Sequence, residues 1–472
     1  MESRVTDMTS GKPSKLILKF ALPLMLGGVF QHLYTVVDAA IVGQFCGVNS
    51  LAALGSTDWL VWFCLGFCVG LTQGFAILIA QHFGAKEYRL LRKSVAMSIV
   101  LAAAIAVVMS VLLQILAEPV LRLLNTDPAV LDEALLYLRI SYGGFAVVMA
   151  YNLLASVLRS LGDGTTPLVA MGVACAVNIG LDLLFVAAFH WGIGGAAGAT
   201  VTAQLVSCLY CAYRFRKLSL LKFSKEDWRL DRPLLKKLFS LGSPLAVQNM
   251  VIHIGGMVLQ SIINTYGVAF LAGFTATNKL YGALELAAIA FGYSIATYTG
   301  QNMGAEKIKR IKKGIRAATV LAIATSLAIT ALALIFSRPL TSLFINAGSE
   351  NAQEALQVAM SYLAVLAVFL PILYLLNIYR SALQGLGDTI TPFLSGMMEL
   401  AMRLACAFTL PMFLGGEGLF LAEPAAWLGA IILLVPVYFI RERKYLNLMV
   451  DRSAEKDWLE KNVAEGKERC PV

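Results

Sequence analysis

Charged residues are scarce in this chain of 472 amino acids. Asp, Glu, Lys and Arg together make up 14% of it, whereas hydrophobic residues make up 58%. Soluble globular domains carry roughly 25% charged and about 45–50% apolar residues. No soluble core could bury this much apolar surface, and the mean hydropathy of +0.73 agrees. The composition excludes a coiled coil, a disordered protein and a nucleic-acid-binding protein, and it predicts a polytopic membrane protein.

Catalytic and metal-binding motifs are also lacking. The sequence contains no His-Glu-x-x-His, no Gly-x-Ser-x-Gly and no P-loop, and its 4 histidines are widely separated. The one Cys-x-x-Cys, formed by Cys208 and Cys211, lies in an apolar run without a second pair, which favours packing over metal or redox chemistry. We therefore expect a protein that is not an enzyme and binds no cofactor.

In place of catalytic motifs, the sequence contains many long apolar runs. A membrane-spanning helix needs about 20 predominantly apolar residues. Twelve such runs lie at approximately 16–45, 51–81, 94–117, 135–158, 166–189, 192–213, 238–265, 270–300, 316–337, 357–383, 391–414 and 417–440. Because the number is even, both termini are expected on the same side of the membrane.

The basic residues indicate which side that is. Most of the 38 Lys and Arg residues lie in alternate connections, namely 1–19, 85–93, 213–237, 304–316 and 441–472 together with Arg159 and Arg380. The other connections carry acids such as Asp132, Glu354 and Glu423. Because Lys and Arg collect in cytoplasmic loops, we predict a multi-pass protein of the plasma membrane with both termini cytoplasmic. The net charge of +9 then reflects orientation and requires no anionic partner.

The two halves of the chain are repeats. Residues 156–167 align with 381–392, and both stretches contain Leu-Gly-Asp followed by Thr-Pro. Gln81-x-x-Gly84-Ala85 likewise aligns with Gln301-x-x-Gly304-Ala305. Halves that each begin on the cytoplasmic side are related by an axis along the membrane normal. The predicted fold class is an all-α polytopic membrane protein whose 12 transmembrane helices form two six-helix lobes related by pseudo-two-fold symmetry along the membrane normal.

The predicted organisation has five parts. These are a cytoplasmic N-terminus (1–15), an N-lobe (16–213, spans 1–6), a cytoplasmic inter-lobe linker (214–237), a C-lobe (238–440, spans 7–12) and a cytoplasmic C-terminal tail (441–472). Trp228 lies among charged residues, as it would in an interfacial helix, but a plain linker accounts for it equally well.

Ionisable residues within the spans mark candidate sites, because charge in lipid is costly. Asn178 and Asp182 are one helical turn apart, and Asp38 lies at a similar level in the first span. Two carboxylates in a dry site cannot both stay charged cheaply, so one can carry a proton. With an Asn amide and a Thr hydroxyl, the same oxygens could hold Na⁺. Alternatively, each aspartate is a buried structural hydrogen-bonding residue.

The second half carries a different set of ionisable residues within its spans. Glu399 and Arg403 are four residues apart, which predicts a salt bridge within one helix. Arg403 aligns with Asn178, so the C-lobe has lost the candidate cation-binding residues of the first half. His253 and Glu285 could line a pore or pair with each other, and aromatic rings could suit a cationic substrate or simply pack. The candidate substrate cavity comprises Gln31, Tyr34, Asn152, His253, Tyr281, Glu285, Asn377, Glu399 and Arg403.

Over about residues 15–445 the sequence resembles the multidrug and toxic compound extrusion (MATE) family. The resemblance rests on Pro23, Val37-Asp38 with Val42-Gly43, the paired Gln-x-x-Gly-Ala and Leu-Gly-Asp motifs, and Asn178-x-x-x-Asp182 followed by the Gly195-Ala-Ala-Gly-Ala-Thr200 stretch. It implies secondary active efflux of cationic or amphipathic compounds in antiport with H⁺ or Na⁺, with two lobes that alternate access. The family's cation ligands correspond to Asp38, Asn178, Asp182 and Thr200, and its helix-bending proline corresponds to Pro23.

The resemblance also favours one branch. NorM-like members place acids in the seventh and tenth spans, whereas residues 248–253 and the segment between Tyr362 and Tyr379 contain none. A DinF-like member coupled through the N-lobe is therefore predicted, working as a monomer in contact with membrane lipid. The alternative function is a lipid-linked saccharide flippase, for which only Arg403 and His253 are obvious cationic residues.

Overall fold

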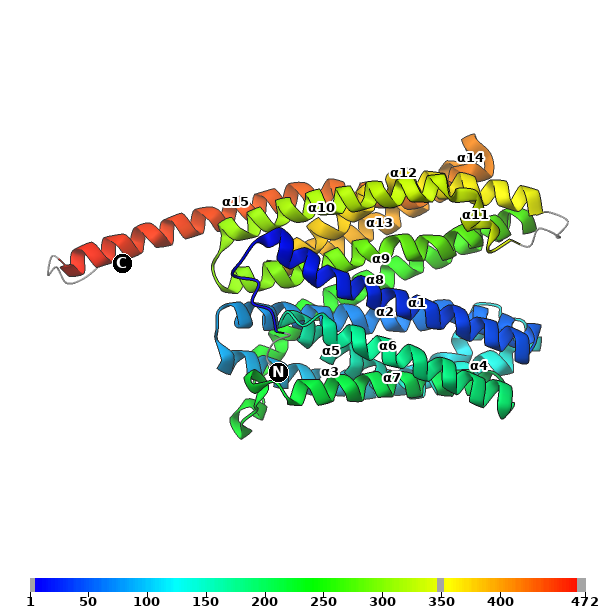
Figure 1. Cartoon of the computed structure of the whole chain (residues 1–472), viewed down its shortest axis with the longest axis horizontal. Coiled ribbons are helices and arrows are strands. Elements are labelled where there is room, and N and C mark those ends of the chain that lie inside the picture. The colour runs from blue at the N-terminus through cyan, green and yellow to red at the C-terminus, as the bar shows by residue number, and fades with distance from the viewer. Residues whose placement is uncertain (1–4, 346–351, 465–472) are drawn as a thin grey trace.

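Long helices dominate the computed structural model, which describes residues 5–345 and 352–464. In these ranges every regular element is a helix, and the long helices run nearly parallel in two groups (Figure 1). The predicted all-α class is confirmed.

The N-terminal half holds seven α-helices and one π-helical segment. They are α1 (Pro13–Phe45), α2 (Val48–Gly84), α3 (Tyr88–Leu123), α4 (Pro128–Gly143), α5 (Phe145–Ser160), α6 (Thr165–Asp182), the π-helix (Leu183–Ala188) and α7 (Gly192–Arg216). The linker forms two short 3₁₀ turns, Ser219–Leu221 and Lys225–Trp228, and no interfacial α-helix.

The C-terminal half repeats this plan. Its elements are α8 (Arg232–Ile263), α9 (Val268–Gly304), α10 (Ile308–Ile335), α11 (Ser337–Ser342), α12 (Ala352–Gly385), α13 (Ile390–Thr409), α14 (Pro411–Leu414), a 3₁₀ turn (Gly415–Leu421) and α15 (Ala422–Ala464). The last helix runs beyond the predicted span and into the predicted tail.

The helices account for twelve membrane passages. Ten stretches of the described residues are long and apolar enough to span a bilayer, and α4 with α5, bent by 47°, makes an eleventh. One of the ten stretches, 390–445, contains both α13 and α15, which pack against each other. The fourth predicted span is therefore two helices joined at Gly144, where a Cβ atom would lie 2.6 Å from Val201 Cγ2 of α7.

Each lobe has its own apolar core, and the first helix of each half crosses from one core to the other. Ile17 and Phe20, at the start of α1, belong to the C-lobe core, whereas Ile41 near its end belongs to the N-lobe core. Conversely, Leu238 at the start of α8 belongs to the N-lobe core, and Leu259 near its end belongs to the C-lobe core. Both helices therefore tie the lobes together.

Each crossing helix contains one internal proline. It is Pro23 in α1 and Pro244 in α8. Proline removes one backbone hydrogen bond and is the commonest cause of a helix bend. The prolines therefore place a point of easy bending in each crossing helix, within the part that packs in its first core.

The lobes approach most closely at one end of the bundle, which we call the basic end because connections 85–87, 217–231 and 305–307 lie there. The segment ahead of α1 is also at this end, and α15 extends beyond the bundle there (Figure 1). A Cβ atom on Gly84 would lie 1.8 Å from the Gln301 carbonyl oxygen, and one on Gly304 would lie 1.8 Å from the Gln81 carbonyl oxygen. The glycines of the repeated Gln-x-x-Gly-Ala motif are thus required for backbone contact between lobes.

The two glutamines of this motif reach across the same contact. Gln81 Nε2 donates to the Gly385 carbonyl oxygen at 3.1 Å, and Gln301 Nε2 donates to the Ser160 carbonyl oxygen at 2.8 Å. Each acceptor is at the end of the helix that precedes a Leu-Gly-Asp turn in the opposite lobe. The two repeated motifs therefore bind each other.

Gly84→Ala should destabilise the protein by about 1–3 kcal/mol, because the added methyl group forces the backbones of α2 and α9 apart. Gly55→Ala, in the same helix with open space around it, should be neutral or slightly stabilising, since alanine favours helix by roughly 0.5–1 kcal/mol over glycine. Thermal unfolding of the purified variants measures both. Equal unfolding temperatures for the two variants would contradict this interpretation of the interface.

Candidate functional site

A polar cluster lies inside the N-lobe, where α1, α6 and α7 meet. Asp38 on α1 is 6% exposed, and Asn178 and Asp182 on α6 are 1% and 0% exposed. Asn178 Nδ2 donates to Thr200 Oγ1 on α7 at 3.4 Å. The Asp38 and Asp182 carboxyl groups lie close to each other. The structure therefore brings together all four residues of the predicted cation-coupling site.

The backbone next to this cluster changes from an α-helix to a π-helix. The α-helix ends at Asp182 and continues as the π-helix, in which Phe189 N–H donates to the Leu184 carbonyl oxygen at 2.9 Å. Such π-helical turns inside helices occur frequently at functional sites. Gly195, at the start of α7, lies against Phe185 of the π-helix, where a Cβ would be 3.2 Å from the Phe185 Cβ. The run of small residues before Thr200 thus allows α7 to approach α6.

The cluster has more acceptors than donors. Asp38 Oδ1, Asn178 Oδ1 and both carboxylate oxygens of Asp182 are buried without a hydrogen-bond partner among the described residues. Buried polar atoms in proteins are normally bonded, and a purely structural aspartate would need a donor. Unpartnered oxygens from two acids and one amide instead suit a proton shared between the carboxyl groups, or a small hard cation.

Two neighbours of the site were absent from the sequence prediction. Tyr137 on α4 is buried and lies close to Asp38 and Asp182. Gln204 lies next to Tyr34, and its Oε1 is buried without a partner. Gln204 is one turn after Thr200 on α7, so its spacing could have indicated it, whereas nothing in the sequence points to Tyr137.

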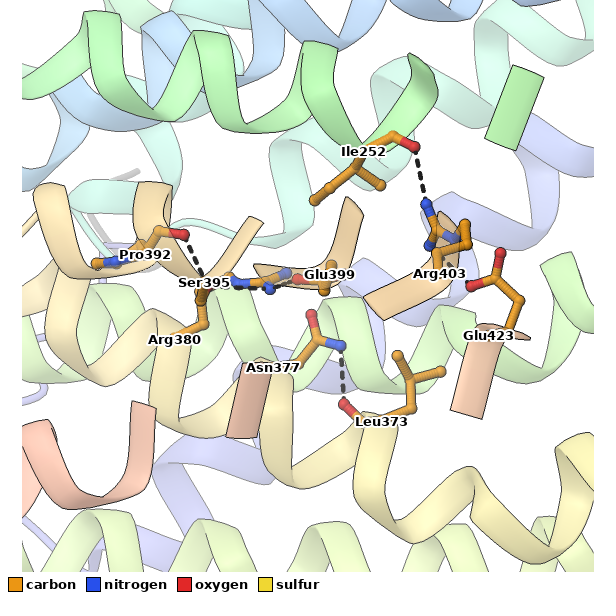
Figure 2. A network of polar contacts seen from close by, with 9 residues as sticks. All are labelled: Ile252, Leu373, Asn377, Arg380, Pro392, Ser395, Glu399, Arg403 and Glu423. Carbon is orange, nitrogen blue, oxygen red and sulfur yellow. Dashed lines mark hydrogen bonds and ion pairs between the residues drawn. The ribbon is translucent and has the colours of Figure 1, made fainter. Parts of the chain in front are cut away.

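The C-lobe carries a separate network of charged residues, drawn in Figure 2. Glu399 on α13 pairs with Arg380 on α12, and Arg380 Nη2 also donates to Ser395 Oγ at 3.2 Å. Arg403 pairs with Glu423 on α15 at 2.8 Å. The predicted salt bridge between Glu399 and Arg403 is therefore wrong, because each of them has a partner on a neighbouring helix.

The arginines of this network connect helices. Arg403 Nη1 also donates to the Ile252 carbonyl oxygen of α8 at 3.1 Å, so one side chain joins α13, α15 and α8 (Figure 2). The Arg380 and Glu423 side chains are 12% and 16% exposed. Both had been assigned to loops from the sequence, but they lie within α12 and α15. Their burial requires the opposite charges that they contact.

The other residues of the predicted cavity are dispersed. Asn152 and Asn377, which align in the repeat, each donate to a carbonyl of their own helix, Val148 at 2.9 Å and Leu373 at 3.0 Å. Gln31 is half-buried on α1, two turns before Asp38.

His253 and Glu285 have different surroundings. His253 lies between lobes, where a Cβ on Gly66 would be 2.8 Å from its ring, and its charged neighbour is Arg403. Glu285 lies near Tyr281 and Glu423, and Tyr281 stacks on Trp427 with ring centroids 5.8 Å apart. The expectation that His253 and Glu285 pair with each other is not met.

A small cavity of about 30 Å³ lies between the lobes toward the basic end. Its lining includes Gln73 and Ser156 of the N-lobe and Tyr293 and Thr297 of the C-lobe, and none of the predicted cavity residues. The Arg159 guanidinium lies 4.5 Å from the Tyr293 ring centroid, and Gln73 Nε2 donates to Gln384 Oε1 at 3.0 Å. Polar contacts across the lobes therefore surround it.

Two repeated six-helix lobes, with buried acids in one and buried ion pairs in the other, define a polytopic membrane transport protein. A family model described as MatE matches residues 23–184 and 244–409, one stretch in each half. The chain belongs to this family of multidrug efflux transporters, as the resemblance implied.

Relatives from *Bacillus subtilis* agree. The probable multidrug resistance protein YpnP is 31% identical over 65% of this chain and 68% of its own length. The probable multidrug resistance protein YoeA is 26% identical over 95% of this chain and 99% of its own length. Other relatives include proteins named NorM and MepA, so the DinF-like branch stays a prediction.

Solved structures share the fold. An outward-facing multidrug resistance MATE family transporter superposes with a TM-score of 0.87 at 22% identity, covering 94% of this chain and 99% of that one. A MOP superfamily transporter from *Pyrococcus furiosus* also gives 0.87, at 23% identity over 93% and 98%. The two-lobed, twelve-helix fold class is thereby confirmed.

The C-lobe ion pairs can be tested by double-mutant cycles. Glu399→Gln should cost about 3–5 kcal/mol, because Arg380 is left buried without its acid. Combining it with Arg380→Met should restore much of that loss. The same cycle for Glu399→Gln with Arg403→Met should show a much smaller coupling. Thermal or denaturant unfolding of the purified variants provides the free energies, and a larger coupling to Arg403 would contradict the pairing.

Proposed function

We propose that this protein exports cationic or amphipathic organic compounds by antiport with H⁺ or Na⁺. The observation that carries the proposal is the buried cluster of Asp38, Asn178, Asp182 and Thr200, whose acids have oxygens without a protein donor. A site of this kind can bind and release a cation, whereas the buried acids Glu399 and Glu423 of the C-lobe are already neutralised by arginines. The relatives named multidrug resistance proteins support the class of substrate.

The crossing of α1 supplies a physical link between ion and substrate. Asp38 lies near one end of α1 in the N-lobe, and Ile17 near the other end packs in the C-lobe core. Loading a proton or Na⁺ removes the repulsion between Asp38 and Asp182 and draws this part of α1 toward α6. The helix bends at Pro23, the contact between lobes changes, and substrate is displaced outward.

Alternating access then exposes the substrate site to one side of the membrane at a time. We propose that the basic end is cytoplasmic, since Lys and Arg concentrate in its connections. The membrane potential contributes about 2.3 kcal/mol per charge per 100 mV, so one or two ions per cycle support modest accumulation. We expect a monomer in the plasma membrane, surrounded by lipid, with no resident cofactor.

The flippase alternative is not favoured by the C-lobe charges. A pyrophosphate headgroup would need free cationic side chains in the interior. Arg403 is paired with Glu423, and Arg380 with Glu399. Each pair is neutral overall, so neither arginine offers an uncompensated charge.

Asp38→Asn and Asp182→Asn should each reduce gradient-driven efflux of a cationic dye to the level of protein-free liposomes, because a neutral amide cannot exchange a proton or charge-balance Na⁺. The matched control is Asp132→Asn, an exposed acid of the same lobe, which should transport at the wild-type rate. Dye efflux from proteoliposomes measures this. Wild-type coupling in either buried-acid variant would refute the site.

Asn178→Ala and Thr200→Val separate the two coupling ions. For Na⁺, loss of a neutral oxygen ligand should raise the half-saturating Na⁺ concentration by about tenfold, the equivalent of 1.4 kcal/mol. For H⁺, efflux driven by a pH gradient should persist in both variants, since the carboxyl groups alone carry the proton. Dye efflux is measured in proteoliposomes with a Na⁺ gradient alone and with a pH gradient alone. Efflux that needs neither gradient would contradict antiport.

A further inference from the structure

A short segment ahead of α1 lies between the lobes at the basic end. We call residues 6–9 the N-terminal strap. Met8 is completely buried and Thr9 is 7% exposed, and Met8 belongs to the C-lobe core. The strap is tied down by contacts with both lobes.

On the C-lobe side, the strap is held through its backbone. Asn302 Nδ2 and Arg310 Nη2 donate to the Met8 carbonyl oxygen at 3.1 and 3.2 Å. Lys307 Nζ donates to the Thr9 carbonyl oxygen at 3.0 Å. Hydrogen bonds from charged donors are the stronger kind, and three side chains of α9, α10 and their connection converge on two consecutive peptide groups.

On the N-lobe side, the strap lies against the Leu-Gly-Asp turn. Thr6 N–H donates to the Leu161 carbonyl oxygen at 3.3 Å. Gly162 has φ +80°, and a Cβ on it would lie 2.2 Å from the Thr6 carbonyl oxygen. Glycine is therefore required here both by the left-handed backbone and by the strap.

The strap also touches the contact between lobes itself. Met8 N–H donates to Gln301 Oε1 at 2.8 Å, while Gln301 Nε2 donates to the Ser160 carbonyl oxygen at 2.8 Å. Both polar atoms of the Gln301 amide are thereby used, one by the strap and one by the N-lobe. The equivalent Gln81 bonds to Gly385 without a strap contact among the described residues. The strap orients only one of the two glutamines.

The corresponding segment ahead of α8 is attached differently. There the linker meets the start of α3 through ion pairs of Arg89 with Glu226 at 3.5 Å and Arg92 with Asp227 at 3.4 Å. The Asp227 side chain is only 4% exposed, and Lys93 pairs with Asp231 at 2.5 Å, so the linker is held firmly, but all of these pairs join it to α3 of the N-lobe. The strap, by contrast, is buried between the lobes, so it is the segment that separation of the lobes at this end must displace.

We propose that the N-terminal strap is a latch that holds the lobes together at the basic end, and that the protein must release it to open that end. The proposal rests on the proposed function in taking this end as cytoplasmic and in requiring that it open. The strap then sets the equilibrium between the closed and open states of this end. Substrate capture from the cytoplasm follows its release.

The repeat provides a matched pair of variants. Gly162→Ala forces the strap away, because the new methyl group occupies the position of the Thr6 carbonyl. Gly387→Ala places alanine at the equivalent turn of the C-lobe with similar backbone strain, φ +90°, but its Cβ meets only Gln81 Nε2 at 3.5 Å. Both variants therefore pay the same conformational cost, and only the first loses the strap.

The readout is accessibility of a cysteine in the cavity between the lobes. Thr297→Cys, in a background with the eight natural cysteines replaced, reports opening through its rate of modification by a membrane-impermeant maleimide added to inside-out vesicles. Gly162→Ala should raise this rate about tenfold, as loss of a few buried hydrogen bonds from one state predicts. Gly387→Ala should leave it unchanged.

A third variant keeps the test decisive if Gly162→Ala does not fold. Residues 5–9 are replaced by five Gly and Ser residues, which leaves every helix intact and should raise the modification rate to the same extent. Wild-type rates in this variant, or equal rates in Gly162→Ala and Gly387→Ala, would overturn the latch. Because labelling needs neither an ion gradient nor a substrate, its outcome is independent of whether antiport itself is correct. A reporter modified from the outside alone would instead refute the proposed orientation.

Discussion

Lipid cannot hydrogen-bond to a protein, so each polar group within the bundle needs a partner from the protein itself. The C-lobe neutralises its buried charges through ion pairs between helices: Arg380 with Glu399 and Arg403 with Glu423. In the N-lobe, by contrast, one carboxylate oxygen of Asp38 and both of Asp182 are among the buried atoms without a hydrogen-bond partner in the described part of the chain. The two lobes share a fold but differ in this respect. The missing donors are the physical reason for assigning ion exchange to the N-lobe.

The same residues explain why the two repeated lobes differ in their buried polar groups. In the aligned positions of α6 and α13, Asn178 corresponds to Arg403 and Asp182 to Ala407. Replacing an amide and an acid by a cation and a methyl group turns an acceptor-rich pocket into a site that must bind a carboxylate, which Glu423 supplies. The crossing helices α1 and α8 then connect the lobe with the unpaired acids to the lobe with the ion pairs, since each helix contributes to both cores.

The spacing of residues in the sequence predicted correctly the contacts between residues that are close in the chain. Gly162 and Gly387 of the Leu-Gly-Asp turns have positive φ, and Asp163 and Asp388 accept hydrogen bonds from the backbone N–H groups of Thr166 and Thr391 that begin the next helices. Spacing also placed Asn178 and Asp182 on one face of α6. It failed for Glu399 and Arg403, because one turn of separation permits a pair but does not select it over partners on α12 and α15. The π-helix after Asp182 and the approach of Tyr137 have no local signature at all.

Composition, hydrophobic run length and internal repetition by themselves determined that this is a membrane protein of two repeated six-helix halves, because lipid imposes length and apolarity on every span. Motif spacing within single helices identified the members of the N-lobe cluster. The tertiary structure alone decided which buried charges neutralise each other, which oxygens stay without donors, and where residues 6–9 lie. These depend on contacts between helices distant in sequence, such as Met8 with Gln301. Such contacts follow from how whole helices pack, which no local pattern records.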